Sequence, residues 1–343
     1  MGLHIGIIGG GFAGRVHAEA ILAHADVDRL SVADSDLASL EGFARDFSVR
    51  RAESDHRALL DDPSVDVIDV CLPHDLHHPV VLDCFEAGKH VIVDKPIANT
   101  LLEADEMLAA ADLADRRFYV ALNQRFIPAH QRVKQLLAEG AIGAPSLATL
   151  TVAGDERPRM GIRGHWKGSW DRAGGGALAD SGTHVVDLAL DWFGAPTALE
   201  CHLARHVIEA PDKADDTAAL MLEYPDLTVS IVVGYASGGQ PWTETRSMWG
   251  VAGAMHVRLE ATEPLELWQD GTRVPQHVEH DPDWWPWSVK RGLDHAVTAI
   301  AHDEPFAVTP ADARATLRTI RAAYEAAGAG RRIVMAEYEG GDR

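Results

Sequence analysis

Three glycines near the start of the chain have the spacing of a turn that binds a dinucleotide. Gly9-x-Gly11-x-x-Gly14 directly follows the apolar run of residues 3–8 and precedes a stretch that favours a helix. The first glycine of such a turn allows the tight bend, the second lets the backbone approach a pyrophosphate, and the third permits close helix–strand packing. Free N–H groups at the helix start hold the pyrophosphate. The motif predicts cofactor contacts from Gly9, Gly11, Phe12, Ala13 and Gly14.

Asp34 follows Gly14 by twenty residues, at the end of a second apolar run. A carboxylate at this place accepts hydrogen bonds from the ribose hydroxyls of the adenosine and repels a 2′-phosphate. Its neighbours Ser35 and Asp36 provide no cation for that phosphate. The sequence therefore favours NAD over NADP. The alternative is that Asp34 only forms a turn, where aspartate is frequent.

The order of apolar segments indicates how these residues would be positioned. Up to about residue 122, short apolar runs alternate with stretches of helical periodicity. Buried parallel strands have this character, and right-handed crossovers would join them into one doubly wound α/β sheet, a Rossmann domain. We expect strands at residues 3–8, 30–33, 65–72, 90–93 and 118–122, and helices at 37–47, 79–87 and 101–114.

The pattern changes after a helix expected near residues 129–139. Alternating and β-branched runs in the second half are typical of an α+β domain with a large, mostly antiparallel open sheet. Its strands are expected at residues 147–153, 199–206, 217–224, 227–235 and 254–260, and a helix at 312–327. We therefore expect an NAD-binding domain over residues 1–124 and a second domain, for substrate and oligomerisation, over residues 125–343.

Composition limits the possible partners. A hydrophobic fraction of 46% and a charged fraction of 24% are typical of a globular protein. No apolar run approaches the roughly 20 residues of a membrane span, and no signal-peptide pattern begins the chain, so we expect a cytoplasmic protein. The net charge of −21 argues against nucleic acid and anionic membranes as partners. Three cysteines without CxxC spacing argue against a disulfide scaffold or a zinc knuckle, and we expect no metal.

A second motif, Asp94-Lys95-Pro96, ends another apolar run. Together with the glycine turn it resembles the Gfo/Idh/MocA family, the relatives of glucose–fructose oxidoreductase and inositol dehydrogenase, whose members carry Glu-Lys-Pro at this point. The family lysine corresponds to Lys95, at the carboxyl end of a strand, where open α/β sheets bind ligands. Asp94 is one methylene shorter than the family's glutamate. Taken alone, Lys95 would be interpreted as a solvated surface lysine.

Residues 174–187 carry a longer resemblance to the family, with the pattern Gly-Gly-Gly-x-Leu-x-Asp-x-Gly-x-His-x-x-Asp, and Trp166 before it also has the family character. Asp180 and His184 are four residues apart across a helix start, so they can face the same side. Two other interpretations stay open. Asp180 can be a helix cap, and Asp180, His184, Asp187 and Asp191 can form a metal site.

Other segments add weaker matches. Family members usually have Thr-Pro followed by a histidine where Leu72-Pro73 and His77 stand, so Leu72 departs from the pattern. Asn123 corresponds to a position near the nicotinamide in the family. The resemblance thus adds cofactor contacts from Leu72, Pro73, His77, Asp94, Lys95 and Asn123.

The resemblance also implies a chemistry. His184 would be the general acid/base, Lys95 would donate a hydrogen bond to the reacting oxygen, and Asp180 would orient or electrostatically support the site. These roles predict an NAD-dependent dehydrogenase that oxidises a secondary hydroxyl of a sugar, a sugar derivative or a cyclitol. An NAD-using glycosidase of the same family and a non-catalytic regulator that senses NAD and a sugar are the alternatives.

Features of the second half bear on the substrate and on assembly. Basic residues gather in residues 155–172, and we expect Arg163 to contact substrate oxygens; the alternative is that these cations form surface ion pairs. The tryptophans of residues 284–287 can stack on a sugar, pack in a loop or contact another subunit. The family implies a homodimer or homotetramer that uses the open sheet face. Substrate contacts are expected from Lys95, Arg163, Trp166, Asp180 and His184.

Overall fold

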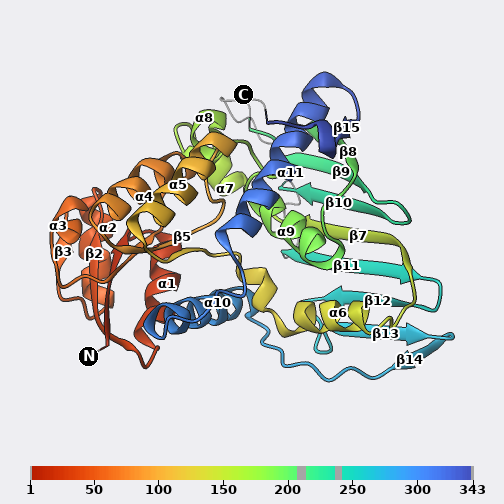
Figure 1. The fold of residues 1–343 in the computed structure, drawn as a ribbon, viewed down its shortest axis with the longest axis horizontal. Coiled ribbons are helices and arrows are strands. Elements are labelled where there is room, and N and C mark those ends of the chain that lie inside the picture. Colours follow the sequence, from red (N-terminus) through yellow and green to blue (C-terminus); the bar gives the residue numbers. More distant parts are fainter. Residues whose placement is uncertain (1, 207–213, 236–241, 341–343) are drawn as a thin grey trace. The chain divides into compact units, whose positions relative to one another are not determined.

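The structure, a computed structural model, describes residues 2–206, 214–235 and 242–340, and the chain divides into two compact units (Figure 1). The first unit consists of residues 1–123 and 285–314, and the second of residues 124–284 and 315–343. The chain leaves the first unit and later returns to it. This differs from the two consecutive domains that the sequence predicted.

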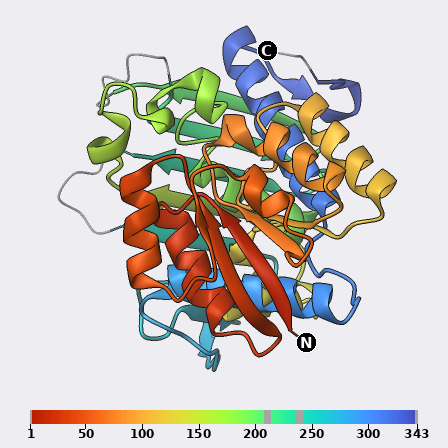
Figure 2. The same cartoon turned by 90° about the vertical axis from the view of Figure 1, so that its left-hand side faces the viewer.

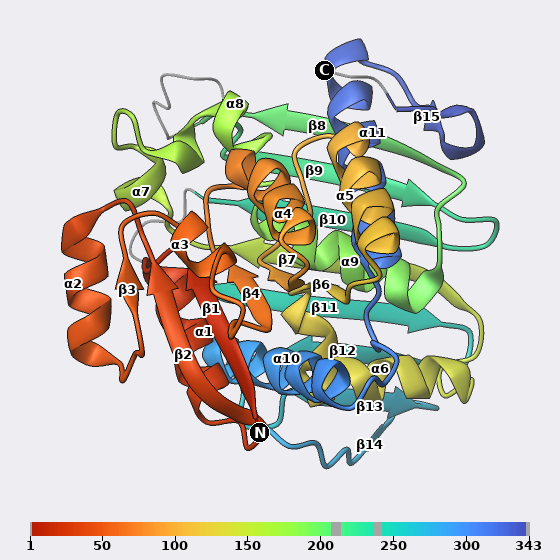
Figure 3. The ribbon, with the colours of Figure 1, turned by 60° about the vertical axis from the view of Figure 1, so that its left-hand side comes forward.

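The first unit is built on a parallel sheet of six strands in the order β3-β2-β1-β4-β5-β6. The strand order reverses between β1 and β4, and ligands bind at such a reversal in open α/β sheets. The strands are β1 (Leu3–Ile8), β2 (Val27–Ala33), β3 (Ala52–Glu53), β4 (Val67–Val70), β5 (His90–Val93) and β6 (Phe118–Val120). The helices between them are α1 (Phe12–Leu22), α2 (Leu37–Asp46), α3 (Arg57–Leu60), α4 (His77–Glu86) and α5 (Leu101–Ala114). Helices α4 and α5 lie in contact with each other (Figure 3).

Helix α10 (Trp284–Ala301) explains why the chain returns to the first unit. Helices α1 and α10 lie side by side in Figures 1 and 2. Just after α1, His24 Nε2 lies 3.0 Å from Thr298 Oγ1 of α10. Beyond α10, Arg117 donates a hydrogen bond of 2.7 Å to Asp303, and its guanidinium lies 4.4 Å from the ring centre of Phe306. Contacts between distant segments therefore decide this boundary.

Local signals explain where several elements of the first unit begin and end. Helix α5 has the predicted bounds because Thr100 and Glu103 form a capping box at its start. Strand β4 is shorter than the predicted strand at residues 65–72, since Pro73 has no backbone N–H and a 3-10 helix follows it. The sequence did not predict β3 and α3, because two and four residues are too short to show a period.

The second unit contains a sheet of nine strands in the order β14-β13-β12-β11-β7-β10-β9-β8-β15. Its described pairs are antiparallel except for β7 with β10, which confirms the expected mostly antiparallel sheet. The strands are β7 (Pro145–Ala153), β8 (Ala198–Ala204), β9 (Thr217–Glu223), β10 (Thr228–Gly234), β11 (Thr243–Gly250), β12 (Gly253–Arg258), β13 (Leu265–Gln269), β14 (Thr272–Val274) and β15 (Ile333–Val334).

Strand β11 lies near the middle of this sheet, yet the sequence did not predict it. Its inward positions include Glu244 and Arg246, which are both buried and form an ion pair with each other. Arg246 also donates a hydrogen bond of 2.9 Å to the side-chain oxygen of Gln124. Because two charged residues occupy core positions, the strand lacks the apolar alternation by which strands are predicted.

Five further helices are α6 (Pro128–Ala138), α7 (Arg157–Met160), α8 (Trp170–Ala173), α9 (Ser181–Phe193) and α11 (Pro310–Ala329). Helix α9 contacts β7 and β10, and its buried side chains cover the sheet. Helix α11 is longer than the predicted helix at residues 312–327. Within the described residues, no helix combines the length and the apolar character that a membrane crossing requires.

Candidate active site

The glycine turn in the first unit has the geometry that a pyrophosphate requires. Gly9 has a φ of +105°, and a Cβ there would lie 2.2 Å from the carbonyl oxygen of Cys71. A Cβ on Gly14 would lie 1.9 Å from the carbonyl oxygen of Gly9. At Gly11, by contrast, no atom of the described residues lies within 4 Å of such a Cβ. The turn is closed on its protein side and open at Gly11, so a dinucleotide fits it.

Asp34 holds this turn through its own carboxylate. One carboxylate oxygen accepts hydrogen bonds from the Gly10 N–H at 2.8 Å and from the Ser39 hydroxyl at 3.0 Å. The other accepts from the Asp36 N–H at 2.9 Å. The turn-forming role that the sequence left open is therefore present. The same contacts fix the carboxylate beside the glycine turn, where an acceptor for ribose hydroxyls belongs.

Lys95 follows β5 and is half-buried, unlike a solvated surface lysine. Its backbone N–H donates a hydrogen bond of 2.8 Å to the carboxylate of Asp94. The segment after it is fixed by His77, whose Nδ1 lies 2.8 Å from the Pro96 carbonyl oxygen. His77 Nε2 lies 2.9 Å from the Leu72 carbonyl oxygen. His77 thus links the segments that follow β4 and β5.

The placement of His77 gives it a positioning role, and its predicted contact with the cofactor stays a prediction. Its side chain is fully buried, and burial lowers the pKa of His77. Since both ring nitrogens lie beside backbone carbonyls, His77 holds Leu72 and Pro96 in place, and the Pro96 contact fixes the segment next to Lys95. The sequence could not show this, because the residues that contact the ring come from two different loops.

Asn123 and the tryptophans of residues 284–287 belong to one contact network. Asn123 Nδ2 donates a hydrogen bond of 2.6 Å to Ser288 Oγ, which donates one of 2.8 Å to the Trp285 carbonyl oxygen. The Trp285 ring stacks on Phe12 of the glycine turn, with ring centres 5.5 Å apart. The tryptophans begin helix α10, and Trp284 is buried. They are packed residues of a helix rather than of a loop.

Asp180 is the centre of a hydrogen-bonded group in the second unit. Its Oδ2 accepts hydrogen bonds from Lys167 Nζ at 2.6 Å and from the Tyr235 hydroxyl at 2.9 Å. Burial raises the pKa of Tyr235 well above its ordinary value, so the phenol keeps its proton and remains a donor. Asp180 stands at the N-cap position of α9, but no cap hydrogen bond from its side chain occurs in the described part of the chain. The helix-cap interpretation is therefore wrong.

Two of the three glycines before Asp180 allow close approach by buried groups, the backbone of Asp215 and the side chain of Tyr324. A Cβ on Gly176 would lie 1.9 Å from the Asp215 carbonyl oxygen, and one on Gly175 would lie 2.0 Å from the Tyr324 hydroxyl. The Gly176 N–H donates a hydrogen bond of 3.1 Å to that hydroxyl, which donates one of 2.8 Å to Asp215. This loop leads into α9, where His184 is 8% exposed. The loop thereby fixes the positions of Asp180 and His184.

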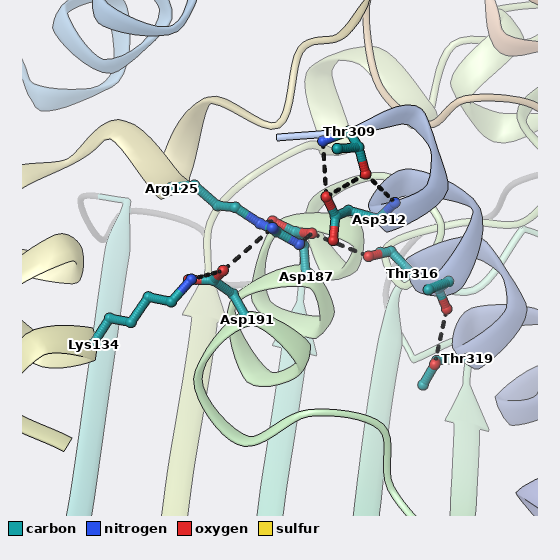
Figure 4. Close-up of polar contacts among 9 residues, drawn as sticks. Arg125, Lys134, Asp187, Asp191, Thr309, Asp312, Thr316 and Thr319 are labelled. Atoms are coloured by element: carbon teal, nitrogen blue, oxygen red, sulfur yellow. Dashed lines mark hydrogen bonds and ion pairs between the residues drawn. The ribbon is translucent and has the colours of Figure 1, made fainter. Parts of the chain in front are cut away.

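Further along α9, two carboxylates are paired with cations (Figure 4). Arg125 donates two hydrogen bonds to Asp187, at 2.8 and 2.6 Å, and approaches Asp191 at 3.2 Å. Lys134 pairs with Asp191 at 2.6 Å, and Thr316 donates a hydrogen bond of 3.1 Å to Asp187. Burial raises the pKa of Asp187, and Arg125 opposes that shift.

These pairs exclude the metal site that the sequence left open on α9. The carboxylates of Asp187 and Asp191 are engaged by Arg125 and Lys134. Among the described residues, Asp180, His184, Asp187 and Asp191 do not form a group whose ligand atoms surround one point.

The basic segment before the glycines contributes a different cation from the one that the sequence indicated. Arg163 is exposed and makes no ion pair within the described ranges. Arg157 and Arg159 pair with Asp155 and Glu156, as the surface-pair interpretation predicted. Lys167 is the cation at Asp180, and it lies 5.7 Å from the ring centre of Trp166. The local signals for Lys167 were its place in the basic segment of residues 155–172 and its position beside Trp166.

Two family models match this chain. One, described as "Oxidoreductase family, NAD-binding Rossmann fold", covers residues 3–122, and the other, "GFO/IDH/MocA C-terminal domain", covers residues 130–253. The chain belongs to the Gfo/Idh/MocA family. Residues 3–122 are the NAD-binding Rossmann domain of this family, which confirms the fold and the cofactor that the sequence predicted.

Similar proteins include named dehydrogenases. Levoglucosan dehydrogenase of Pseudarthrobacter phenanthrenivorans is 33% identical over 226 residues, which are 64% of this chain and 58% of that protein. Trans-1,2-dihydrobenzene-1,2-diol dehydrogenase of Mus musculus is 30% identical over 232 residues, which are 64% and 67% of the two chains. The match thus spans about three fifths to two thirds of these relatives. A solved levoglucosan dehydrogenase in complex with NADH has the same fold, with a TM-score of 0.87, 24% identity and coverage of 97% and 99%.

Proposed function

We propose that this member of the Gfo/Idh/MocA family is an NAD-dependent dehydrogenase that reversibly oxidises a secondary hydroxyl of a sugar, a sugar derivative or a cyclitol. The observation that carries the proposal is the carboxylate of Asp180, which Lys167 and Tyr235 hold at the start of the helix that carries His184. A buried carboxylate that accepts hydrogen bonds from an ammonium group and a phenol, four residues before a buried imidazole, suits a reaction that moves a proton. The two relatives described above are dehydrogenases by name, which supports the same reaction class.

NAD, when bound by the glycine turn and Asp34, would supply the acceptor for the hydride that leaves the substrate carbon. The chain's own residues would handle the proton and the charge on oxygen. His184 would take the hydroxyl proton at its imidazole as the carbonyl forms, and return it in the reverse direction. Lys95 would donate a hydrogen bond to the reacting oxygen and stabilise its developing negative charge.

The other polar groups would position His184 and Lys95. Asp180 would orient His184 and the substrate hydroxyls, while Lys167 and Tyr235 keep its carboxylate fixed. His77 would hold the loop that carries Lys95. Lys167, rather than the exposed Arg163, is the cation at Asp180, and the substrate contact predicted for Arg163 stays to be tested.

The proposal is tested by incubating the purified protein with NAD and a panel of hexoses, pentoses, inositols and uronates while the absorbance of NADH is recorded. We expect NADH to form with at least one compound, and kcat/KM to be higher with NAD than with NADP because of Asp34. Cleavage of a glycoside without net NADH would instead indicate the NAD-using glycosidase. Binding of NAD without turnover of any compound or glycoside would indicate the regulator.

We also propose that the chain self-associates through the open face of the nine-stranded sheet. Large apolar side chains on that face are 37–46% exposed, and the cross-strand register places them on one side: Leu147, Met221, Val232, Trp249 and Trp268. Exposed apolar patches of this kind mark protein interfaces. The family's expected homodimer or homotetramer would cover them.

Sedimentation equilibrium tests this assembly. The unaltered chain should sediment as a dimer or tetramer, and the double variant Met221→Glu, Trp249→Glu should associate at least about tenfold more weakly, since it buries charge at the interface. Leu113→Glu is the matched control, because Leu113 is 91% exposed on α5 of the other unit. A monomeric unaltered chain, or an equal loss in the control, would contradict this interface.

A further inference from the structure

We propose that the first unit binds one divalent metal ion of the zinc class at His17, Asp69 and Cys71. Among the residues that the structure describes, these three form the group of His, Cys and acidic side chains whose ligand atoms all lie within 4.8 Å of one another. Imidazole, carboxylate and thiolate are all ligands that Zn²⁺ accepts. The sequence predicted no metal, because residue 17 and residues 69–71 meet only in the folded chain.

The three side chains bring their ligand atoms nearly as close together as a tetrahedral zinc ion requires, although Asp69 faces His17 and Cys71 through different carboxylate oxygens. His17 Nδ1 lies 2.9 Å from Asp69 Oδ2 and 3.3 Å from Cys71 Sγ. Cys71 Sγ lies 3.7 Å from Asp69 Oδ1. Ordinary zinc–ligand bond lengths place such atoms about 3.4–3.6 Å apart. Side-chain movements of a few tenths of an ångström would therefore admit the ion, with a fourth position left for water or another external ligand.

The fold holds these ligands on rigid elements. Asp69 lies in β4 and Cys71 directly follows it, so that residues two apart point to the same face of the sheet. His17 lies in α1, and both His17 and Asp69 are buried, at 3% and 0% exposure. Ligands on a core strand and its neighbouring helix are already positioned before an ion binds.

The local charge also favours a cation. The Asp69 carboxylate is fully buried, where a carboxylate is costly unless it is paired; its partner in the structure is the His17 imidazole, and a bound cation would take over that pairing. The nearby carboxylate of Asp94 acts electrostatically on both His17 and Cys71. A divalent ion bound to one carboxylate and one thiolate forms a locally neutral group. The competing arrangement is a hydrogen-bonded pair of His17 and Asp69 beside a neutral thiol.

A bound ion would brace the glycine turn. The Cys71 N–H donates a hydrogen bond of 2.8 Å to the Ile8 carbonyl oxygen, at the end of the strand before the turn. The Cys71 carbonyl is also the group that a side chain at Gly9 would strike. Metal binding should therefore raise the thermal stability of the first unit, whatever the substrate of the protein.

The test uses the full chain, stripped of metal with a chelator and titrated with Co²⁺ and then with Zn²⁺. We expect one Co²⁺ per chain with a thiolate-to-cobalt charge-transfer band, displacement of the band by Zn²⁺, and a higher midpoint of thermal unfolding. Cys71→Ser should abolish the band and weaken Zn²⁺ binding at least about a hundredfold. Cys84→Ser is the matched control, because Cys84 is a buried cysteine of the same unit outside the group.

Two results would overturn the proposal. One is the absence of the charge-transfer band from the unaltered chain, which is the outcome expected for a hydrogen-bonded pair beside a neutral thiol. The other is equal metal binding by Cys71→Ser and the unaltered chain, as adventitious binding among the 18 histidines would give. If Cys71→Ser fails to fold, the spectrum of the unaltered chain still decides, since the metal ligand is the thiolate.

Discussion

The variants Lys95→Ala and His184→Ala should each lower kcat by about a hundredfold or more, while NAD binding stays nearly unchanged. Effects of this size are typical when a general acid/base or a group that stabilises charge on oxygen is removed. Asp180→Asn should be similar or milder, because the amide still reaches Lys167 or Tyr235. Steady-state rates with the compound found in the substrate screen, and calorimetric titration with NAD, measure the two quantities. Near-native turnover in both alanine variants would contradict the assignment.

The same measurements compare two cations of residues 155–172, Lys167 and Arg163. Lys167→Ala should lower kcat/KM by about ten- to hundredfold, because a hydrogen bond to a charged group contributes roughly 1.5–3 kcal/mol. Arg163→Ala is the matched control and should stay within about twofold, since Arg163 is exposed. A midpoint of thermal unfolding near that of the unaltered chain would show that the loss in Lys167→Ala is not a loss of fold. A larger effect at Arg163 than at Lys167 would restore the role that the sequence indicated for Arg163.

Arg125→Ala should lower the free energy of unfolding by about 3–5 kcal/mol, because it leaves the buried charge of Asp187 without its partner. The Asp187 side chain is 1% exposed and that of Arg125 9% exposed, so water cannot replace the lost contacts. Unfolding in urea, followed by circular dichroism, measures the change. Lys134→Ala is the control from the exposed end of the same network. It should lower the free energy of unfolding by less than about 1 kcal/mol.

The sign of the pH dependence separates a charge effect from a cavity effect. Burial already raises the pKa of Asp187 in the folded chain, and removal of Arg125 raises it further. Because the folded variant then holds its proton more tightly than the unfolded chain, its stability falls as the pH rises through the folded pKa. The deficit of Arg125→Ala should therefore be smaller near pH 4 than at pH 7. Adding Asp187→Asn to the Arg125→Ala variant should recover part of the lost free energy of unfolding at pH 7. An equal deficit at both pH values would contradict the charge effect.

Local sequence was sufficient wherever one short segment carries the whole requirement. The turn from Gly9 to Gly14 must bend, approach a ligand and pack closely, and each demand falls on a residue of that same segment. Helix α5 begins where its own capping residues place it. Asp180 and His184 lie on a single loop and helix, so their spacing and the family pattern identified them together. The alternation of strands and helices predicted the Rossmann domain for the same reason.

Tertiary structure decided which distant residues became the hydrogen-bond partners of the residues that the sequence had identified. Lys167 and Tyr235 reach Asp180 from 13 and 55 residues away. Periodicity reports which face of an element is buried, but it does not report which element packs there. Periodicity also misleads where charged residues are buried, as Glu244 and Arg246 are in β11, because such burial is stable only when the two charges pair and their other polar atoms find partners such as Gln124. The return of helix α10 to the first unit and the meeting of His17 with Asp69 and Cys71 depend on long-range contacts in the same way. The sequence by itself determined the cofactor turn and the candidate catalytic pair, whereas the folded chain determined the groups that hold them in place.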